Sequence, residues 1–128
     1  MSTKQQHGEF CWNELMTTDT SKAKEFYGKL FGWTYQDHPM KDMTYTMFNN
    51  GEKGVAGLLQ IPQQDKGKIP PHWMSYILVT DLEETLNNAQ ILGGQVKVPA
   101  TSIEGFGRFG ILSDPTGAHI ALWESANP

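Results

Sequence analysis

Hydrophobic and polar positions along the chain follow one unit that occurs twice: an apolar strand, an Asp, an amphipathic helix and a Gly before the next strand. Asp19 and Asp81 open the two helices, 62 residues apart, and the same offset carries Leu15 onto Ile77. A repeat of this length is too long for an ordinary solenoid and too short for two independent domains. The pattern therefore predicts two half-domains that build one cradle together.

Two helices are predicted from apolar residues that recur at i, i+3, i+4, i+7 and i+8. In the first helix these residues are Ala23, Phe26, Tyr27, Leu30 and Phe31; in the second they are Leu82, Leu86, Ala89 and Leu92 or Gly93. Asp19 or Thr20 supplies the first N-cap and Gly32 a left-handed stop. Asp81 caps the second helix, which stops at Gly93-Gly94.

Eight strands complete the pattern. They are predicted at Phe10–Met16, Trp33–Gln36, Thr44–Phe48, Val55–Ile61, Trp73–Val79, Gln95–Pro99, Phe109–Leu112 and His119–Trp123. A connector over residues 62–71 divides module one (about 8–61) from module two (about 72–125) within a single domain, 1–128. The fold class is α+β: two βαβββ modules that form a curved mixed β-sheet cradle with helices on the outer face.

Composition narrows the functional classes. The 128 residues carry a net charge of −4 without a basic run, so we expect no nucleic-acid partner. We also expect no membrane span and no secretory segment, which makes the cytoplasm the default compartment. Cys11 is the only cysteine, so an internal disulfide and a cysteine-based zinc cluster are excluded. Its side chain is expected to point toward the helix, as a structural thiol.

Several motifs resemble the vicinal oxygen chelate superfamily, which includes glyoxalase I, bleomycin-resistance proteins and extradiol dioxygenases. They are the opening Phe-Cys-Trp-Asn-Glu-Leu-Met-Thr-Thr-Asp, the helix end Phe-Tyr-Gly-Lys-Leu-Phe-Gly-Trp and the closing Ser-Asp-Pro-Thr-Gly. Val55-Ala56-Gly57 and Pro70-Pro71-His72-Trp73 are similar to a glyoxalase-like or hydroxylase-like subgroup. The resemblance implies a homodimer, and it is specific for fold rather than for activity.

Metal-dependent members of that superfamily take one ligand from each of four strands, typically two His and two Glu. Counting along the chain from Asp19, Asp81 and Asp114 places three of these positions at Trp12, at or near Ser75 and at Ala121. The remaining position is expected in the Gly57–Leu59 region. None of these residues is a metal ligand. A His119–Glu14 pair would supply only two ligands, so we expect no metal and no cofactor.

Alternation along the strands places aromatic and apolar side chains in the cradle. The candidate ligand-binding residues are Trp12, Trp73, Ser75, Arg108 and Trp123, and the candidate catalytic residues are Glu14 and His119. Each of these residues also has a purely structural interpretation. In that interpretation the tryptophans fill the cradle, and the Glu14 carboxylate is hydrogen-bonded within the sheet. His119 is then a solvated side chain at the rim, Ser75 a small spacer, and Arg108 part of a glycine-rich hairpin. Burial would raise the pKa of Glu14, as a general acid or base requires.

Three functions follow from these residues. The leading one is a metal-independent protein that binds a small organic molecule, cationic or planar, in an aromatic pocket. The alternative is a glyoxalase-like enzyme, a lyase, isomerase or oxygenase-type activity, in which Glu14 transfers a proton with help from His119 or Arg108. The third is a non-catalytic interaction module whose cradle is filled by its own side chains.

Overall fold

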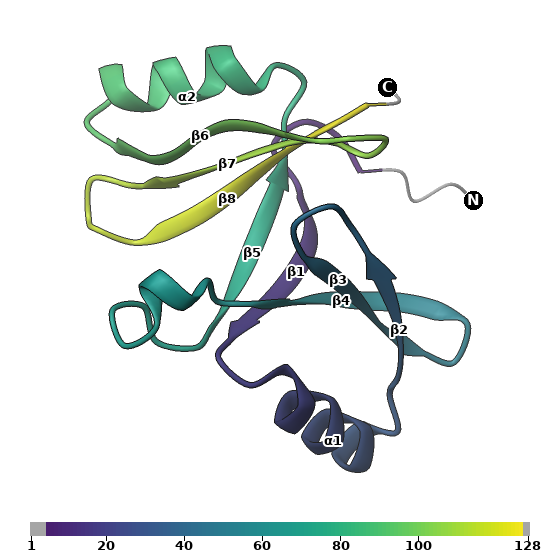
Figure 1. Cartoon of the computed structure of the whole chain (residues 1–128). Coiled ribbons are helices and arrows are strands. Elements are labelled where there is room, and N and C mark those ends of the chain that lie inside the picture. The colour runs from purple at the N-terminus through teal and green to yellow at the C-terminus, as the bar shows by residue number, and fades with distance from the viewer. Residues whose placement is uncertain (1–4, 127–128) are drawn as a thin grey trace. The chain divides into compact units, whose positions relative to one another are not determined.

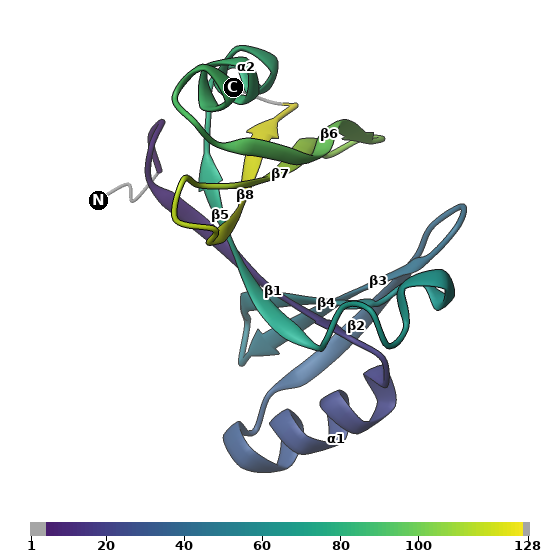
Figure 2. The same cartoon turned by 90° about the vertical axis from the view of Figure 1, so that its left-hand side faces the viewer.

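The computed structural model describes residues 5–126, and their contacts divide into two compact units. One unit comprises Trp12–Met74, and the other joins the described residues up to Cys11 with those from Ser75 onward. Each contains one helix and a set of paired strands, as Figures 1 and 2 show. The elements in chain order are β1 (Phe10–Thr17), α1 (Thr20–Phe31), β2 (Thr34–Pro39), β3 (Thr44–Asn50), β4 (Lys53–Gln60), the 3-10 turn η1 (Gln63–Asp65), β5 (His72–Leu78), α2 (Leu82–Ile91), β6 (Gln95–Ile103), β7 (Gly107–Ser113) and β8 (His119–Ser125).

In the unit Trp12–Met74 the strand order is β2-β3-β4-β1. The pair β1–β4 is parallel, while β2–β3 and β3–β4 are antiparallel. One face of this sheet packs against α1. The buried core there consists of Leu15, Ala23, Phe48, Ala56 and Leu58, with Tyr27, Trp33 and Val55 at its margin.

The second unit repeats this plan with the order β5-β8-β7-β6. The pair β5–β8 is parallel, and β8–β7 and β7–β6 are antiparallel. Its core lies under α2 and consists of Val79, Leu82, Leu86, Leu112 and Leu122, with Ile77, Ala89, Val96, Ala100 and Ile120 packed against it. The α+β class and the two βαβββ modules with mixed strand pairing are therefore confirmed.

Both helices begin and end where the sequence predicts. Asp19 accepts a hydrogen bond from the Lys22 amide at 3.0 Å, which resolves the choice of N-cap in its favour. Gly32 ends α1 with φ +76°, a left-handed conformation that costs a glycine little. Asp81 accepts from the Glu84 amide at 3.1 Å. No helix among residues 5–126 is long and apolar enough to cross a membrane.

The start of the chain pairs with the second module, although the sequence assigns it to the first. The Gly8 amide donates to the Leu78 carbonyl, and the Leu78 amide donates to the Glu9 carbonyl, both at 2.8 Å. The Thr80 amide also donates to Nδ1 of His7 at 3.1 Å. Backbone hydrogen bonds thus join Gly8 and Glu9 to Leu78 at the end of β5.

The face of β5 that carries the predicted site residue Ser75 does not lie beside Ala121. Tyr76 is the register partner of Ala121, and Ile77 packs into the α2 core. Because side chains alternate along a strand, Ser75 lies on the α2 side with Ile77. The sequence repeat indicates the face of β5 that packs against α2, since Ile77 is the equivalent of Leu15, which faces α1.

Removing the N-cap of α2 should lower the free energy of unfolding. We expect Asp81→Ala to reduce the free energy of unfolding by about 1 kcal/mol, because the Glu84 amide loses its acceptor. Asp81→Asn keeps a side-chain oxygen at the same place and should cost less. Urea unfolding followed by circular dichroism measures both; equal losses would contradict the capping role.

Candidate functional site

The face of the unit Trp12–Met74 opposite α1 holds a chain of directed hydrogen bonds. Trp12 Nε1 donates to the Tyr45 hydroxyl oxygen at 2.8 Å. The Tyr45 hydroxyl in turn donates to the Glu14 carboxylate. Only 5% of Glu14 is exposed. A buried carboxylate from β1 is thus reached by a phenol from β3, which an indole on β1 holds in place.

Gly57 on β4 makes room for this arrangement. It is the register partner of Glu14 on one side and of Met47 on the other. A Cβ at this position would overlap the Tyr45 hydroxyl and lie 3.0 Å from Oε2 of Glu14. The missing side chain is therefore what allows the phenol to approach the carboxylate.

The environment keeps the Tyr45 hydroxyl protonated. Burial raises the pKa of Tyr45 far above its usual value, and the negative charge of Glu14 and the hydrogen bond to it raise it further. The bond from Trp12 acts in the opposite direction and is outweighed. Tyr45 therefore remains a donor throughout the physiological pH range.

The direction of these bonds decides what the site offers to a ligand. The donor protons of Trp12 and Tyr45 are both used inside the chain. An ionised carboxylate accepts about four hydrogen bonds in all. Glu14 is therefore the acceptor for Tyr45, and any further group that contacts its carboxylate has to be a donor or a cation.

Trp12 and Glu14 are predicted from the sequence, whereas Tyr45 and Gly57 are not. The signal was the glycine in the strand Val-Ala-Gly-Leu-Leu, since glycine in a strand often marks the close approach of another group.

The residues at the expected metal positions do not form a metal site. Among residues 5–126 no group of three or more His, Cys, Asp or Glu side chains lies close enough together to hold an ion. Trp12 donates its indole proton to Tyr45, and Ala121 is fully buried. This donor set does not suit a divalent cation, which takes several nitrogen, oxygen or sulfur ligands.

Four of the predicted site residues belong to the other unit: Ser75, Arg108, His119 and Trp123. His119 at the start of β8 is exposed, and Trp123 on the same strand is half-buried opposite Phe109 and Leu78. Ser75 is half-buried on the α2 side of β5, as described above.

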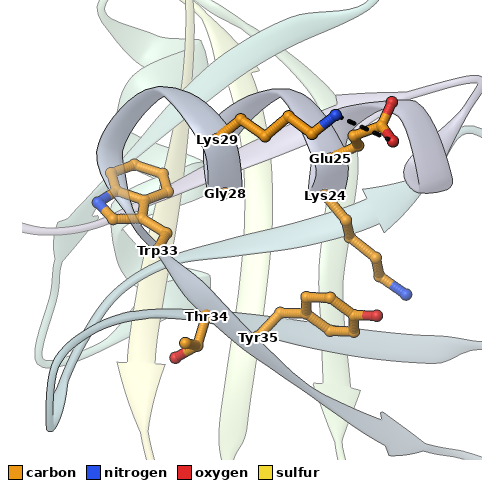
Figure 3. A pocket seen from close by; sticks show the side chains of 7 residues that line it. All are labelled: Lys24, Glu25, Gly28, Lys29, Trp33, Thr34 and Tyr35. Carbon is orange, nitrogen blue, oxygen red and sulfur yellow. Dashed lines mark ion pairs between the residues drawn. The ribbon is translucent and has the colours of Figure 1, made fainter.

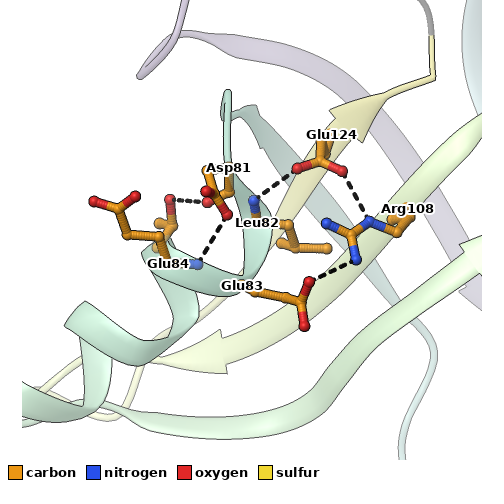
Figure 4. Close-up of polar contacts among 7 residues, drawn as sticks. Asp81, Leu82, Glu83, Glu84, Arg108 and Glu124 are labelled. Atoms are coloured by element: carbon orange, nitrogen blue, oxygen red, sulfur yellow. Dashed lines mark hydrogen bonds and ion pairs between the residues drawn. The ribbon is translucent and has the colours of Figure 1, made fainter.

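Arg108 is engaged by carboxylates of its own unit (Figure 4). Its Nε donates to Glu124 at 2.8 Å and its Nη1 to Glu83 at 3.0 Å. Glu124 also accepts from the Leu82 amide at 2.9 Å, at the first turn of α2. An anionic ligand would have to compete with both carboxylates, and the observed contacts tie β7, β8 and α2 together.

Trp73 packs on the α1 side of its unit. Its indole Nε1 donates to the Tyr27 hydroxyl at 3.2 Å, and the two rings meet edge to face at 5.6 Å. Trp12 lies on the opposite face of the sheet with Glu14. The structure therefore does not bring these two tryptophans together on one surface.

A shallow groove of about 390 Å³ runs between α1 and β2 (Figure 3). It is lined by Lys24, Glu25, Gly28, Lys29, Trp33, Thr34 and Tyr35. Both lysines are paired: Lys24 with Asp37 at 3.1 Å and Lys29 with Glu25 at 3.7 Å. Lys24 also lies 4.5 Å from the centre of the Tyr35 ring.

Cys11 is half-buried, and burial raises the pKa of its thiol. A raised pKa leaves little thiolate at neutral pH. This environment agrees with the structural role that the sequence predicts.

The space at Gly57 can be tested by filling it. We expect Gly57→Ala to lower the free energy of unfolding by about 1–3 kcal/mol, because the new methyl group meets the Tyr45 phenol. Gly54→Ala on the same strand is the control, since its methyl group would meet the flexible Met47 thioether at 2.9 Å. Chemical denaturation compares them, and equal costs would contradict a specific requirement at Gly57.

The Glu124 ion pair makes a pH-dependent contribution to stability. Arg108, followed by the Leu82 amide, holds the pKa of Glu124 below its ordinary value of 4.5. Because the pKa of Glu124 is lower in the folded state, the ion pair contributes its full stability above the unfolded-state value of 4.5. This contribution is lost as the pH falls through the folded-state pKa. We expect Glu124→Gln to be less stable than the parent at pH 7, and the difference to shrink as the pH falls below the ordinary value of 4.5. Urea titrations at several pH values test this, and a pH-independent difference would contradict it.

Comparisons with known proteins agree with this fold. A family model described as the Glyoxalase/Bleomycin resistance protein/Dioxygenase superfamily matches residues 10–122. Methylmalonyl-CoA epimerase from Mycobacterium tuberculosis has a similar structure, with a TM-score of 0.66, 17% identity and coverage of 98% of this chain and 93% of that one. A hypothetical protein from Bacillus halodurans C-125 has a TM-score of 0.71 at 12% identity, with 96% and 98% coverage. At these identities the likeness concerns the fold alone.

Two relatives are similar in sequence. A Mycobacterium tuberculosis protein named "Putative glyoxylase CFP32" is 39% identical over 116 residues, which are 89% of this chain and 44% of that protein. The anthracycline biosynthesis protein DnrV of Streptomyces peucetius is 29% identical over 130 residues, covering 91% and 46%. The chain thus spans less than half the length of these relatives. The family match over residues 10–122 places this chain in the Glyoxalase/Bleomycin resistance protein/Dioxygenase superfamily.

Proposed function

We propose that this chain is a metal-independent small-molecule-binding protein of the glyoxalase/bleomycin-resistance type. One observation carries the proposal: a buried carboxylate, Glu14, is aligned by the hydrogen-bond chain from Trp12 through Tyr45. Burying a charge is costly unless it is hydrogen-bonded. We infer that a buried carboxylate on the sheet face opposite the α1 core serves to bind a ligand.

The ligand class follows from the hydrogen-bond accounting. Glu14 accepts and does not donate, and the protons of Trp12 and Tyr45 already have acceptors. The matching ligand is therefore a small aromatic molecule with a protonated amine. Its ring lies against Trp12 and its N–H groups bond to the carboxylate.

A matched pair of probes tests this proposal. Tryptamine and indole-3-propionate share an indole ring and differ in the sign of their charge. We expect tryptamine to stabilise the protein, by about 2.7 kcal/mol at 100 times its Kd, and indole-3-propionate to have no effect. Thermal unfolding and titration calorimetry measure both. Stabilisation by the acid but not the amine would contradict the role of Glu14.

Glu14→Gln is the corresponding variant, since it keeps the shape of the side chain and removes its charge. We expect tryptamine to bind this variant at least tenfold more weakly, because a charge-assisted hydrogen bond contributes about 1.5–3 kcal/mol. Addition of Zn²⁺ or Ni²⁺ to the parent protein should leave the affinity unchanged. If no probe binds and Trp12→Ala merely loses about 3–5 kcal/mol of stability, the side chains form a filled core instead.

The alternative is a glyoxalase-like enzyme in which Glu14 transfers a proton. A relative named as a putative glyoxylase and a solved epimerase with a similar fold support this enzyme alternative. In that case Glu14→Gln would still bind a converted compound but would no longer turn it over. Proton NMR of the compound before and after incubation distinguishes binding from turnover.

A further inference from the structure

Tyr45 reaches the Glu14 carboxylate from a strand that is not its neighbour. In the order β2-β3-β4-β1, strand β4 separates β3, which carries Tyr45, from β1. Neighbouring strands lie about 4.8 Å apart, which puts the backbones of β3 and β1 roughly 10 Å from each other. The Tyr45 side chain therefore crosses β4 at Gly57, where even one Cβ would overlap its hydroxyl.

The Tyr45 hydroxyl acts there as both an acceptor and a donor. Its oxygen accepts from Nε1 of Trp12 at 2.8 Å, and its proton is donated to Glu14. Trp12 and Glu14 are two residues apart on β1, so their side chains leave the same face of one strand. One strand thus supplies a donor and an acceptor that meet at a single hydroxyl group.

The second module provides an internal comparison. Ala121 takes the place of Gly57 there, and it is fully buried. Phe109 takes the place of Tyr45, because each lies two residues before the antiparallel partner of that small residue. Where the ring has no hydroxyl, a methyl group is accommodated on the neighbouring strand. The fold is therefore built without this hydroxyl in one module, and in the other the hydroxyl occurs together with Glu14.

We propose that Tyr45 is the specificity-determining residue of the Glu14 site, because its hydroxyl occupies the place where the hydroxyl of a ligand would bind. Trp12 and Glu14 match one hydroxyl group, since an indole N–H donates and a carboxylate accepts. An alcohol or a phenol needs both partners, and Tyr45 already bonds to both. This inference rests on the proposed function and names the ligand class that the site rejects.

An amine is affected less than an alcohol of the same shape. An ammonium group has three donor protons and no lone pair, so it needs acceptors alone. An alcohol that donates to Glu14 also has lone pairs that need a donor, and Tyr45 uses the indole proton of Trp12. A polar group that loses water without gaining a partner weakens binding. Tyr45 therefore selects for amines against alcohols.

Tyr45→Phe tests the proposal, because it removes the hydroxyl and keeps the ring. Tryptamine and tryptophol share an indole ring and a two-carbon chain, which ends in an ammonium group in the first and a hydroxyl in the second. In the parent we expect tryptamine to bind at least tenfold more tightly. In Tyr45→Phe we expect the affinity for tryptophol to rise about tenfold, because its hydroxyl then accepts from Trp12 and donates to Glu14. Titration calorimetry measures both ligands, and an unchanged preference in the variant would overturn the proposal.

Two further variants show whether the change arises at this place. Tyr35→Phe removes the hydroxyl of a tyrosine that is 51% exposed beside the groove of Figure 3, and it should keep the preference of the parent. Trp12→Phe combined with Tyr45→Phe removes the indole proton and should abolish the gain for tryptophol. A gain that persists in this double variant would contradict the role of Trp12. A general loosening of the site would change both affinities alike, and an unchanged ratio would also contradict the proposal.

Chemical rescue separates this inference from the proposed function. Tyr45→Ala removes the phenol, and p-cresol is the same phenol as a free molecule. We expect p-cresol to raise the melting temperature of this variant, toluene to raise it less because it lacks the hydroxyl, and the parent to show no comparable response. Equal effects of the two compounds would overturn the inference. If tryptamine does not bind the parent, the proposed function fails, while the response to p-cresol still decides whether Trp12 and Glu14 bind a hydroxyl.

Discussion

The burial of the Glu14 carboxylate is the most demanding requirement that this sequence places on its fold. A charge removed from water needs hydrogen bonds to compensate for its lost hydration. Tyr45 supplies one, Trp12 holds Tyr45, and Gly57 leaves the space in which they meet. Three strands have to keep one register for this to happen, because a shift by one residue would turn each side chain to the other face. The same register directs Leu15, Phe48 and Leu58 under α1.

The two modules share their architecture and differ in their chemistry. At the position of Glu14, 62 residues later, the second module has Tyr76, which is also buried. Each of these residues pairs with a small residue on a parallel neighbour, Gly57 in one case and Ala121 in the other. The repeat thus preserves the packing rule, a large side chain beside a small one, while only the first module has a carboxylate at this place. A repeated fold can vary its sites in this way without changing its cores.

Arg108 illustrates how a tertiary contact changes the meaning of a residue. In the sequence it is a single cation in a glycine-rich segment, which suggests a group free to bind an anion. In the structure Glu124 and Glu83 receive its guanidinium, and Glu124 also bonds to the first turn of α2. The side chain holds β7, β8 and α2 in place, a role that depends on residues 16 and 25 positions away.

The sequence by itself determined the elements, their order and the caps at Gly32 and Asp81, because helices and strands are specified by local periodicity and by capping residues. The choice of Asp19 over Thr20 as the first N-cap came from the structure. The sequence also identified Trp12 and Glu14 as neighbours on one face of β1, since alternation is a property of a single strand. Only the tertiary structure decided what meets that face. Tyr45 and Gly57 come from other strands, and strand pairing over such separations is set by the packing of the whole sheet rather than by local pattern. For the same reason the face of β5 was assigned wrongly: with apolar residues on both sides of the strand, only the contact of Ile77 with the α2 core distinguishes them.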